Sequence, residues 1–129
     1  MDRLKVFKIL IVDDSALFRQ TLKEILQVQF PSIEIHEATD GENARQKIKT
    51  SPPDLIFMDI NLPGENGLVL TKKIKARYPN IIIILVTGWD LPEYREASTQ
   101  FKADDLLFKG SATQEKIFAL VESVLPTRE

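Results

Sequence analysis

The sequence predicts an α/β fold, a doubly wound sandwich in which five parallel strands are covered by helices on both faces. Short apolar runs alternate with longer amphipathic stretches along the 129 residues. Four of the five runs are apolar at consecutive positions, which is typical of parallel strands buried on both faces. Five strand–helix pairs in this order favour one sheet with right-handed crossovers. With 43% hydrophobic residues, a chain of this length is expected to form one domain with a real core.

The predicted strands are the five apolar runs, at residues 7–12, 33–36, 55–58, 81–86 and 106–108. The second run, Ile33-Glu34-Ile35-His36, alternates apolar and polar side chains. Alternation of this kind indicates a strand with one face in water, so we expect the second strand to lie at an edge of the sheet.

The first and last helices are predicted from apolar side chains at helical spacing. These are Phe18, Leu22, Ile25 and Leu26 in the first helix, and Ile117, Leu120, Val121 and Val124 in the last. Proline marks several boundaries, because it suits the first turn of a helix and interrupts its interior. The stretch 67–78 is therefore expected to be a helix that stops before Pro79, and Pro126 ends the last helix.

The two remaining helices are predicted at 40–49 and 92–101, where large aliphatic residues are scarce. Pro92 suits the first position of its helix, with Asp90 as the cap. Because these stretches offer little apolar surface, we expect them to pack less tightly and to be the more mobile elements.

Composition excludes several classes of protein. The chain has no cysteine, which excludes a disulfide scaffold, thiolate metal sites and a cysteine nucleophile. Its formal net charge of -2 is unlike that of a free-standing nucleic-acid-binding domain. The longest aliphatic run, 81–86, is too short to cross a bilayer, and the first apolar stretch runs into two aspartates rather than a signal-peptide cleavage site. We therefore expect one soluble, cytoplasmic domain.

Polar side chains follow four of the five predicted strands. Asp13 and Asp14 follow the first strand, Asp59 the third, Thr87 the fourth and Lys109 the fifth. Taken one by one they have ordinary explanations, as a helix cap, a turn residue, a strand end and a surface lysine. In an open parallel sheet, however, ligands bind outside the carboxyl ends of the strands, and complementary groups there on four strands indicate a site.

Three neighbouring carboxylates repel one another unless a cation neutralises them. With oxygen ligands only, a hard divalent cation is expected, and Mg²⁺ (or Mn²⁺) fits best. A metal ion, a lysine and a hydroxyl can together gather the oxygens of a phosphoryl group, and a carboxylate can attack phosphorus. The residues therefore predict phosphoryl transfer onto an aspartate.

The stretches ILIVDDS, DLIFMDINLPGENGL, IIIILVTG and LLFK resemble, in this order, the receiver domain of two-component response regulators. The resemblance covers nearly the whole chain. It implies a flavodoxin-like sandwich with strand order 2-1-3-4-5, a switch driven by phosphorylation, and a histidine kinase as the phosphoryl donor. It also implies that the domain catalyses its own phosphorylation and slow dephosphorylation without being a metabolic enzyme.

The resemblance assigns a role to each candidate residue. Asp59 would be the phosphoacceptor, Thr87 would contact the phosphoryl group and carry the conformational signal, and Lys109 would pair with the phosphate. The implied Mg²⁺ ligands are Asp13, Asp14, Asp59 and the backbone carbonyl of Asn61.

Two positions depart from the usual receiver pattern: Gly110 replaces a common proline, and Leu106 replaces a common Tyr or Phe that changes rotamer in the switch. The pair Lys109-Gly110, with SALFRQTL and LPGENGL, is most similar to the receivers of LuxR/NarL-type regulators, which carry a DNA-binding helix-turn-helix domain. We expect residues 1–129 to be a single receiver domain with a core at about 6–125 and no output domain. The output partner is thus either unknown or a missing DNA-binding domain.

We expect this domain to bind neither nucleic acid nor membrane directly, and to be a monomer or a weak phosphorylation-dependent dimer. Trp89, two residues beyond Thr87, is either a packing residue or a shield against water at the phosphorylated aspartate. His36 is expected to be structural or exposed. The basic run is expected to be an exposed helix face, at Lys72, Lys73, Lys75 and Arg77. Tyr94 and Phe101 are core anchors or part of a docking surface.

Two other function classes compete with the phospho-switch. A Mg²⁺-dependent phosphohydrolase with an aspartyl intermediate usually has a second carboxylate two residues after the nucleophile, and Asn61 stands there. A phosphate-independent binding module with an inactive pocket gains some support from Leu106. The complete set of candidate residues favours the switch.

Overall fold

The computed structural model describes residues 6–126 as alternating strands and helices. The strands are β1 (Lys8–Val12), β2 (Glu34–Ala38), β3 (Leu55–Asp59), β4 (Ile82–Thr87) and β5 (Asp105–Phe108). The helices are α1 (Ala16–Gln29), α2 (Gly41–Thr50), α3 (Gly67–Arg77), α4 (Pro92–Gln100) and α5 (Gln114–Val124). All neighbouring strands are parallel, in the order β2-β1-β3-β4-β5. The predicted doubly wound sandwich is therefore confirmed.

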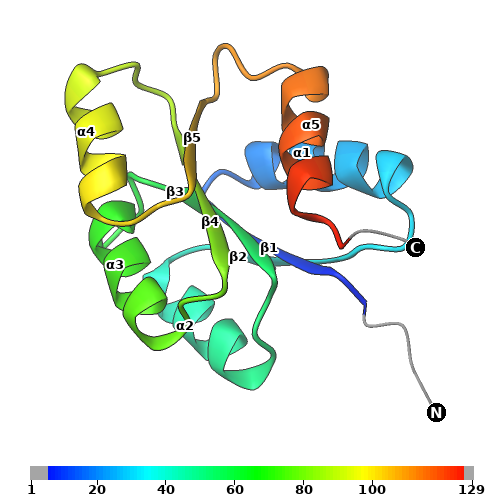
Figure 1. Ribbon diagram of the computed structural model, residues 1–129, viewed down its shortest axis with the longest axis horizontal. Helices are drawn as coiled ribbons and strands as arrows, with labels where there is room; N and C mark the ends of the chain where they lie inside the picture. Colours follow the sequence, from blue (N-terminus) through cyan, green and yellow to red (C-terminus); the bar gives the residue numbers. More distant parts are fainter. Residues whose placement is uncertain (1–5, 127–129) are drawn as a thin grey trace.

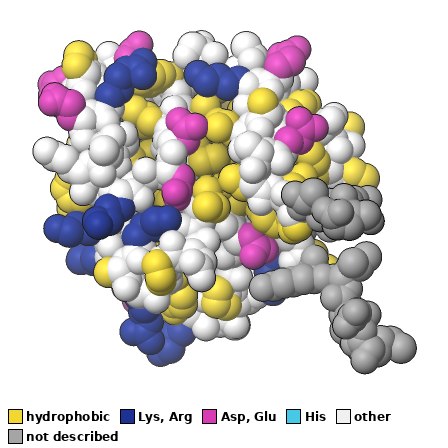
Figure 2. Space-filling model, in the orientation of Figure 1, with side chains coloured by type: hydrophobic (Ala, Val, Ile, Leu, Met, Phe, Trp, Pro, Cys, Tyr) yellow, Lys and Arg dark blue, Asp and Glu magenta, His cyan; other side chains and the backbone are white. Residues whose placement is uncertain are grey.

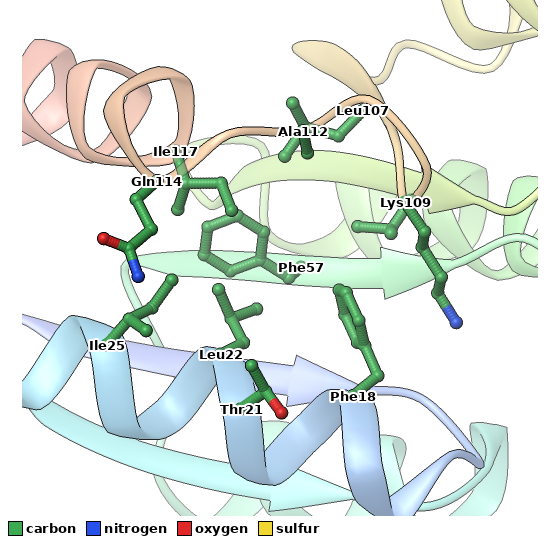
Figure 3. Close-up of a pocket in the computed structure, with 11 residues that line it drawn as sticks. Phe18, Thr21, Leu22, Ile25, Phe57, Leu107, Lys109, Ala112, Gln114 and Ile117 are labelled. Atoms are coloured by element: carbon green, nitrogen blue, oxygen red, sulfur yellow. The ribbon is translucent and has the colours of Figure 1, made fainter.

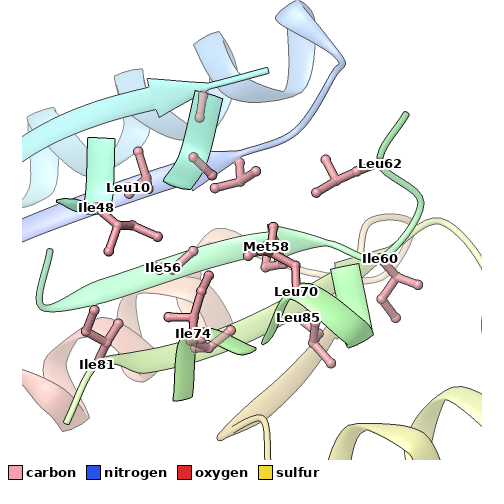
Figure 4. Close-up of a cluster of buried hydrophobic side chains, with 14 of the residues drawn as sticks. Leu10, Ile48, Ile56, Met58, Ile60, Leu62, Leu70, Ile74, Ile81 and Leu85 are labelled. Atoms are coloured by element: carbon pink, nitrogen blue, oxygen red, sulfur yellow. The ribbon is translucent and has the colours of Figure 1, made fainter. Parts of the chain in front are cut away.

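The sheet separates two apolar layers, with α1 and α5 on one face and α2, α3 and α4 on the other (Figure 1). Successive side chains of a strand point to opposite faces. In β1, Ile9 and Ile11 thus pack with α1 and α5. Leu10 and Val12 belong to the apolar cluster on the opposite face, which is covered by α2 and α3 (Figure 4). Consecutive apolar residues in the strands follow from this burial on both sides.

The predicted edge strand lies at an edge but is displaced along the chain. β2 begins at Glu34 rather than at residue 33 and continues to Ala38. The alternation predicted for residues 33–36 is confirmed, since Ile33 and Ile35 are buried while Glu34 and His36 are exposed. His36 pairs with Glu34 across 2.8 Å at the surface, as expected for a histidine outside the candidate site.

The helix caps differ from the prediction at α4. Pro92 is the first helical residue, as expected, but the cap is Leu91, which makes no side-chain capping bond. Asp90 lies one residue too early to cap, and its carboxylate lies 3.6 Å from Arg95 instead. At α1 the cap is Ser15, whose Oγ accepts a hydrogen bond from the Phe18 amide. The aspartates before α1 are therefore not needed as its cap.

The two helices with few large aliphatic residues, α2 and α4, were both expected to pack loosely, and only α4 does so. α4 contains no buried residue, as expected, although Tyr94 and Phe101 are half-buried against the core. α2 nevertheless buries Gly41, Ala44 and Ile48, because its few apolar residues all lie on one side. Greater mobility of these helices remains a prediction. None of the helices within residues 6–126 has the length and apolar character needed to cross a membrane.

Candidate functional site

Three carboxylates from two strands meet at the carboxyl edge of the sheet. Asp13 and Asp14 directly follow β1, and Asp59 is the last residue of β3. Because β1 and β3 are paired neighbours, their ends coincide. One oxygen from each carboxylate lies within 4.8 Å of the other two. Asp13 and Asp59 are buried, with 1% and 5% of their surface exposed, whereas Asp14 is exposed and opens the cluster to solvent.

The carboxylate of Asp59 is buried next to other carboxylates, and the nearby positive charge does not fully compensate for them. Its Oδ1 accepts a hydrogen bond of 3.1 Å from the Asn61 amide. Burial, followed by the charge of Asp13, raises the pKa of Asp59, and the Asn61 amide and Lys109 offset this only in part. The cluster therefore gains from a further cation.

Asp13 is anchored from several sides but keeps one oxygen without a hydrogen bond. Its Oδ1 accepts a 2.8 Å bond from the Ser15 amide, and its backbone carbonyl accepts a 2.6 Å bond from Arg19. Its Oδ2 lies 2.9 Å from the ammonium of Lys109. That contact is an ion pair without hydrogen-bond geometry, and within the described residues Oδ2 has no hydrogen-bond partner. A buried carboxylate oxygen of this kind is suited to a metal ligand.

The donor set fits Mg²⁺. All three side chains offer hard carboxylate oxygens, and Mg²⁺ binds such groups while retaining several waters. The exposed Asp14 leaves one side of the cluster open to those waters. A divalent cation would also offset the repulsion that raises the pKa of Asp59.

Thr87 and Lys109 reach the same edge from β4 and β5. Thr87 ends β4 and is fully buried, and its carbonyl accepts a 2.8 Å hydrogen bond from the Lys109 amide. Its hydroxyl oxygen accepts a 3.1 Å bond from the amide of Trp89, whose side chain is 63% exposed. All five side chains predicted for the site thus lie at the carboxyl edge of the sheet. The two hydrogen bonds of Thr87, however, come from the backbone amides of Lys109 and Trp89 and do not link it to the carboxylates.

A model of the response regulator receiver domain matches residues 9–122, almost the whole described chain. The chain belongs to this family. It is a receiver domain of two-component response regulators, a phosphoacceptor signalling module whose acidic pocket is the cluster of Asp13, Asp14 and Asp59.

Solved structures agree with this family in fold. The receiver has a TM-score of 0.84 to the chemotaxis protein CheY4 of Vibrio cholerae, with 28% identity over 94% of this chain and 100% of that one. The response regulator TrrA of Thermotoga maritima, solved in complex with Mg²⁺ and BeF, has a TM-score of 0.82 and 32% identity over 93% and 100% of the two chains.

Among curated relatives, the receiver is 34% identical over 118 residues to the oxygen regulatory protein NreC of Staphylococcus carnosus. It is 36% identical over 101 residues to the aerobic respiration control protein ArcA of Escherichia coli. The matched parts cover 91% and 78% of this chain, but only 54% of NreC and 41% of ArcA. The receiver thus spans about half the length of these relatives.

An apolar pocket of about 230 Å³ adjoins the site between α1 and α5 (Figure 3). Lys109 and Phe18 line it, with the ammonium of Lys109 4.5 Å from the centre of the Phe18 ring. Phe57 from β3 is another lining residue and is almost fully buried. Lys109 is therefore placed between an aromatic ring and the buried carboxylate of Asp13.

The amino-acid sequence did not predict the roles of Arg19 and Gly67 or the contact between Phe18 and Lys109. Arg19 braces the Asp13 carbonyl and also bonds Glu37 through Nε at 3.0 Å. The Gly67 amide donates a 2.7 Å bond to the carbonyl of Ile60, directly after Asp59. Arg19 and Gly67 lie in the stretches SALFRQTL and LPGENGL, which carry the family resemblance, but neither stretch by itself indicates such a contact. Phe18 was recognised only as one of the apolar positions of a helix.

Proposed function

We propose that Asp59 is the phosphoacceptor of this receiver and that a histidine kinase supplies the phosphoryl group. The observation that carries this proposal is the arrangement of Asp13, Asp14 and Asp59 within 4.8 Å, with Lys109 2.9 Å from Asp13. An acidic nucleophile, a cation site and an ammonium are the groups that phosphoryl transfer to a carboxylate requires.

In the proposed reaction, a carboxylate oxygen of Asp59 attacks the phosphorus of a phosphohistidine. The new O–P bond forms as the P–N bond breaks, and its electron pair returns to the imidazole nitrogen of the kinase. The proposed Mg²⁺ ligands are Asp13, Asp14, Asp59 and the backbone carbonyl of Asn61, with Mn²⁺ as a possible substitute. The cation would supply positive charge beside the phosphoryl oxygens and keep Asp59 ionised.

Lys109 and Thr87 are proposed to stabilise the phosphorylated state. The Lys109 ammonium, now paired with Asp13, would pair with the phosphoryl oxygens. The Thr87 hydroxyl accepts a bond from Trp89 through its oxygen, which leaves its proton for donation to a phosphoryl oxygen. The carbonyl of Thr87 also accepts a hydrogen bond from the Lys109 amide. A movement of Thr87 at the end of β4 would therefore shift Lys109 at the end of β5.

We further propose that residues 1–129, with a core at about 6–125, act as one receiver domain that controls a LuxR/NarL-type DNA-binding output. The matches to NreC and to the transcriptional regulatory protein DegU of Brevibacillus brevis support this, the latter 38% identical over 88 residues. The receiver would be a monomer or a weak phosphorylation-dependent dimer. A gain of dimer on phosphorylation, measured by sedimentation, tests the second part of this proposal.

Intact-mass spectrometry after incubation with acetyl phosphate and Mg²⁺ tests the phosphoacceptor. We expect one phosphoryl adduct, which is absent in Asp59→Asn and after chelation of Mg²⁺. Asp105→Asn is the matched control, because Asp105 is an exposed aspartate at the start of β5. An adduct that persists in Asp59→Asn, or no adduct under any condition, would contradict the proposal.

A further inference from the structure

Positive charge is concentrated on two neighbouring helices. α2 and α3 contain seven of the 17 Lys and Arg residues of the chain but only one of its 19 Asp and Glu residues, Glu42. The two helices therefore carry a net charge of +6, and the rest of the chain carries -8. Several Lys and Arg side chains in Figure 2 lie over the side where Figure 1 places α2 and α3.

A groove of about 310 Å³ lies between these helices. Its floor is aliphatic and almost inaccessible, since Ile48, Leu70 and Ile74 are at most 5% exposed. Its rim carries four exposed cationic side chains, Arg45, Lys49, Lys73 and Arg77. We call this feature the α2–α3 groove. It shares no residue with the acidic pocket.

Much of the positive charge at the rim is not neutralised. Glu65, in the loop before α3, accepts bonds from Arg45 at 2.6 Å and Lys73 at 3.3 Å, so one carboxylate serves two cations. Lys49 and Arg77 form no ion pair within the described residues, and the Arg77 guanidinium lies 5.8 Å from the centre of the Tyr78 ring. By contrast, Lys75 was expected to be exposed but is only 13% exposed, because it binds Asp104 and two backbone carbonyls.

We propose that the α2–α3 groove binds an acidic segment of a partner protein. One or two apolar side chains of that segment would occupy the floor, and its carboxylates would pair with the rim. The groove has about twice the volume of an engineered cavity of ~150 Å³ that holds one benzene ring. It therefore has room for one or two apolar side chains of the partner. Complementary charge at the rim would favour fast, selective association. This interaction is independent of phosphoryl transfer at Asp59.

The floor of the groove argues against two other partners. Single-stranded nucleic acid binds by stacking bases on aromatic rings, whereas the floor side chains of Ile48, Leu70 and Ile74 are aliphatic. A membrane surface takes up apolar side chains that project from a helix, whereas these lie at the bottom of a recess. A protein segment can place its own apolar side chains into such a recess.

Fluorescence anisotropy with a short labelled peptide, in which two leucines stand among glutamates, tests the proposal. We expect saturable binding that weakens as salt is added and is lost when the glutamates are replaced by glutamine or the leucines by serine. Arg77→Glu and, separately, Lys49→Glu should each weaken binding about tenfold, because like charges then face each other. The matched control is Lys116→Glu, an exposed charge reversal on α5 that should leave binding unchanged.

Three results would overturn the proposal. The first is equal binding by wild type, Arg77→Glu and Lys49→Glu. The second is preferential binding of single-stranded DNA or of vesicles rich in phosphatidylserine over the peptide. The third is self-association of the wild type that Arg77→Glu abolishes, which would assign the groove to a second copy of the chain. Thermal unfolding and phosphorylation by acetyl phosphate should be the same in all variants, so failure here is distinguishable from failure of the proposed phosphoacceptor.

Discussion

The α-carbon of Gly67 packs directly against the carbonyl of Asp59. A β-carbon at Gly67 would lie 2.1 Å from that carbonyl oxygen and 2.9 Å from its carbon. Backbone atoms at this distance cannot be avoided by a rotamer change. The absence of a side chain at the start of α3 therefore allows this helix to approach the strand end that carries the candidate phosphoacceptor.

Gly67→Ala should destabilise the domain by about 1–3 kcal/mol, because α3 must move away from the end of β3. Urea unfolding measures this loss. Gly110→Ala is the control, since a β-carbon there has no neighbour within 4 Å, and its effect should stay within about 0.5 kcal/mol. Equal stability of the two variants would show that the close approach is not a constraint.

Asp59→Asn should stabilise the metal-free domain at neutral pH. Burial and the charge of Asp13 raise the pKa of Asp59, so its ionisation disfavours the folded state. Below the ordinary aspartate pKa of 3.8 the carboxyl is protonated in both folded and unfolded chains, and the variant gains nothing. The advantage grows as the pH rises through the raised pKa.

Thermal unfolding of both proteins in chelator across this pH range measures that difference. Asp105→Asn, which removes an exposed carboxylate outside the acidic cluster, is measured alongside as the control. A constant difference between wild type and Asp59→Asn at every pH would contradict the electrostatic explanation.

Mg²⁺ should stabilise the folded receiver. At a free concentration of 100 times Kd, binding to the folded state alone contributes about 2.7 kcal/mol. Asp14→Asn should lose most of this stabilisation, because the variant removes one carboxylate of the cluster. Denaturant unfolding with and without Mg²⁺ provides the measurement. Glu122→Gln, which removes an exposed carboxylate on α5, should retain the full response.

Lys109→Gln should cost about 1–3 kcal/mol in the absence of divalent cations, because the buried carboxylate of Asp13 loses its paired cation. Mg²⁺ should then stabilise this variant more than it stabilises the wild type. Urea unfolding in chelator and in Mg²⁺ separates the two effects. The same Mg²⁺ response in Lys109→Gln and in the exposed control Lys116→Gln would show that Lys109 and Mg²⁺ do not offset the charge of the same carboxylate, Asp13.

Trp89→Ala should shorten the lifetime of the phosphorylated state several-fold. Trp89 follows Thr87 by two residues, its amide bonds the Thr87 hydroxyl and it is 63% exposed. If the indole shields the acyl phosphate, as the sequence suggested, its removal should open a path for water. The Trp89 amide that bonds Thr87 is retained in alanine. Loss of the phosphoryl adduct over time, followed by intact mass, gives the rate. Leu91→Ala, a partly exposed apolar side chain in the same loop, is the control, and an unchanged lifetime in Trp89→Ala would remove the shielding role.

Hydrophobic patterning was sufficient for the fold and for the position of the acidic cluster. Consecutive apolar residues in the strands indicated a parallel sheet, and in such a sheet the residues after each strand share one edge. Asp13, Asp14, Asp59, Thr87 and Lys109 were therefore predicted together from local sequence alone. The cap of α4 was not, because the sequence offered Asp90, whose side chain can cap a helix, whereas the cap is Leu91, which makes no side-chain capping bond.

The sequence by itself determined which residues form strands, which polar groups follow them and which charges α2 and α3 carry. Only the tertiary structure decided which atoms meet: Gly67 against the Asp59 carbonyl, Arg19 on the Asp13 carbonyl, and two basic helix faces around one aliphatic groove. Periodicity reports the buried side of each element separately. Contacts between elements depend on strand register, helix orientation and backbone approach, which are settled when all the elements pack together.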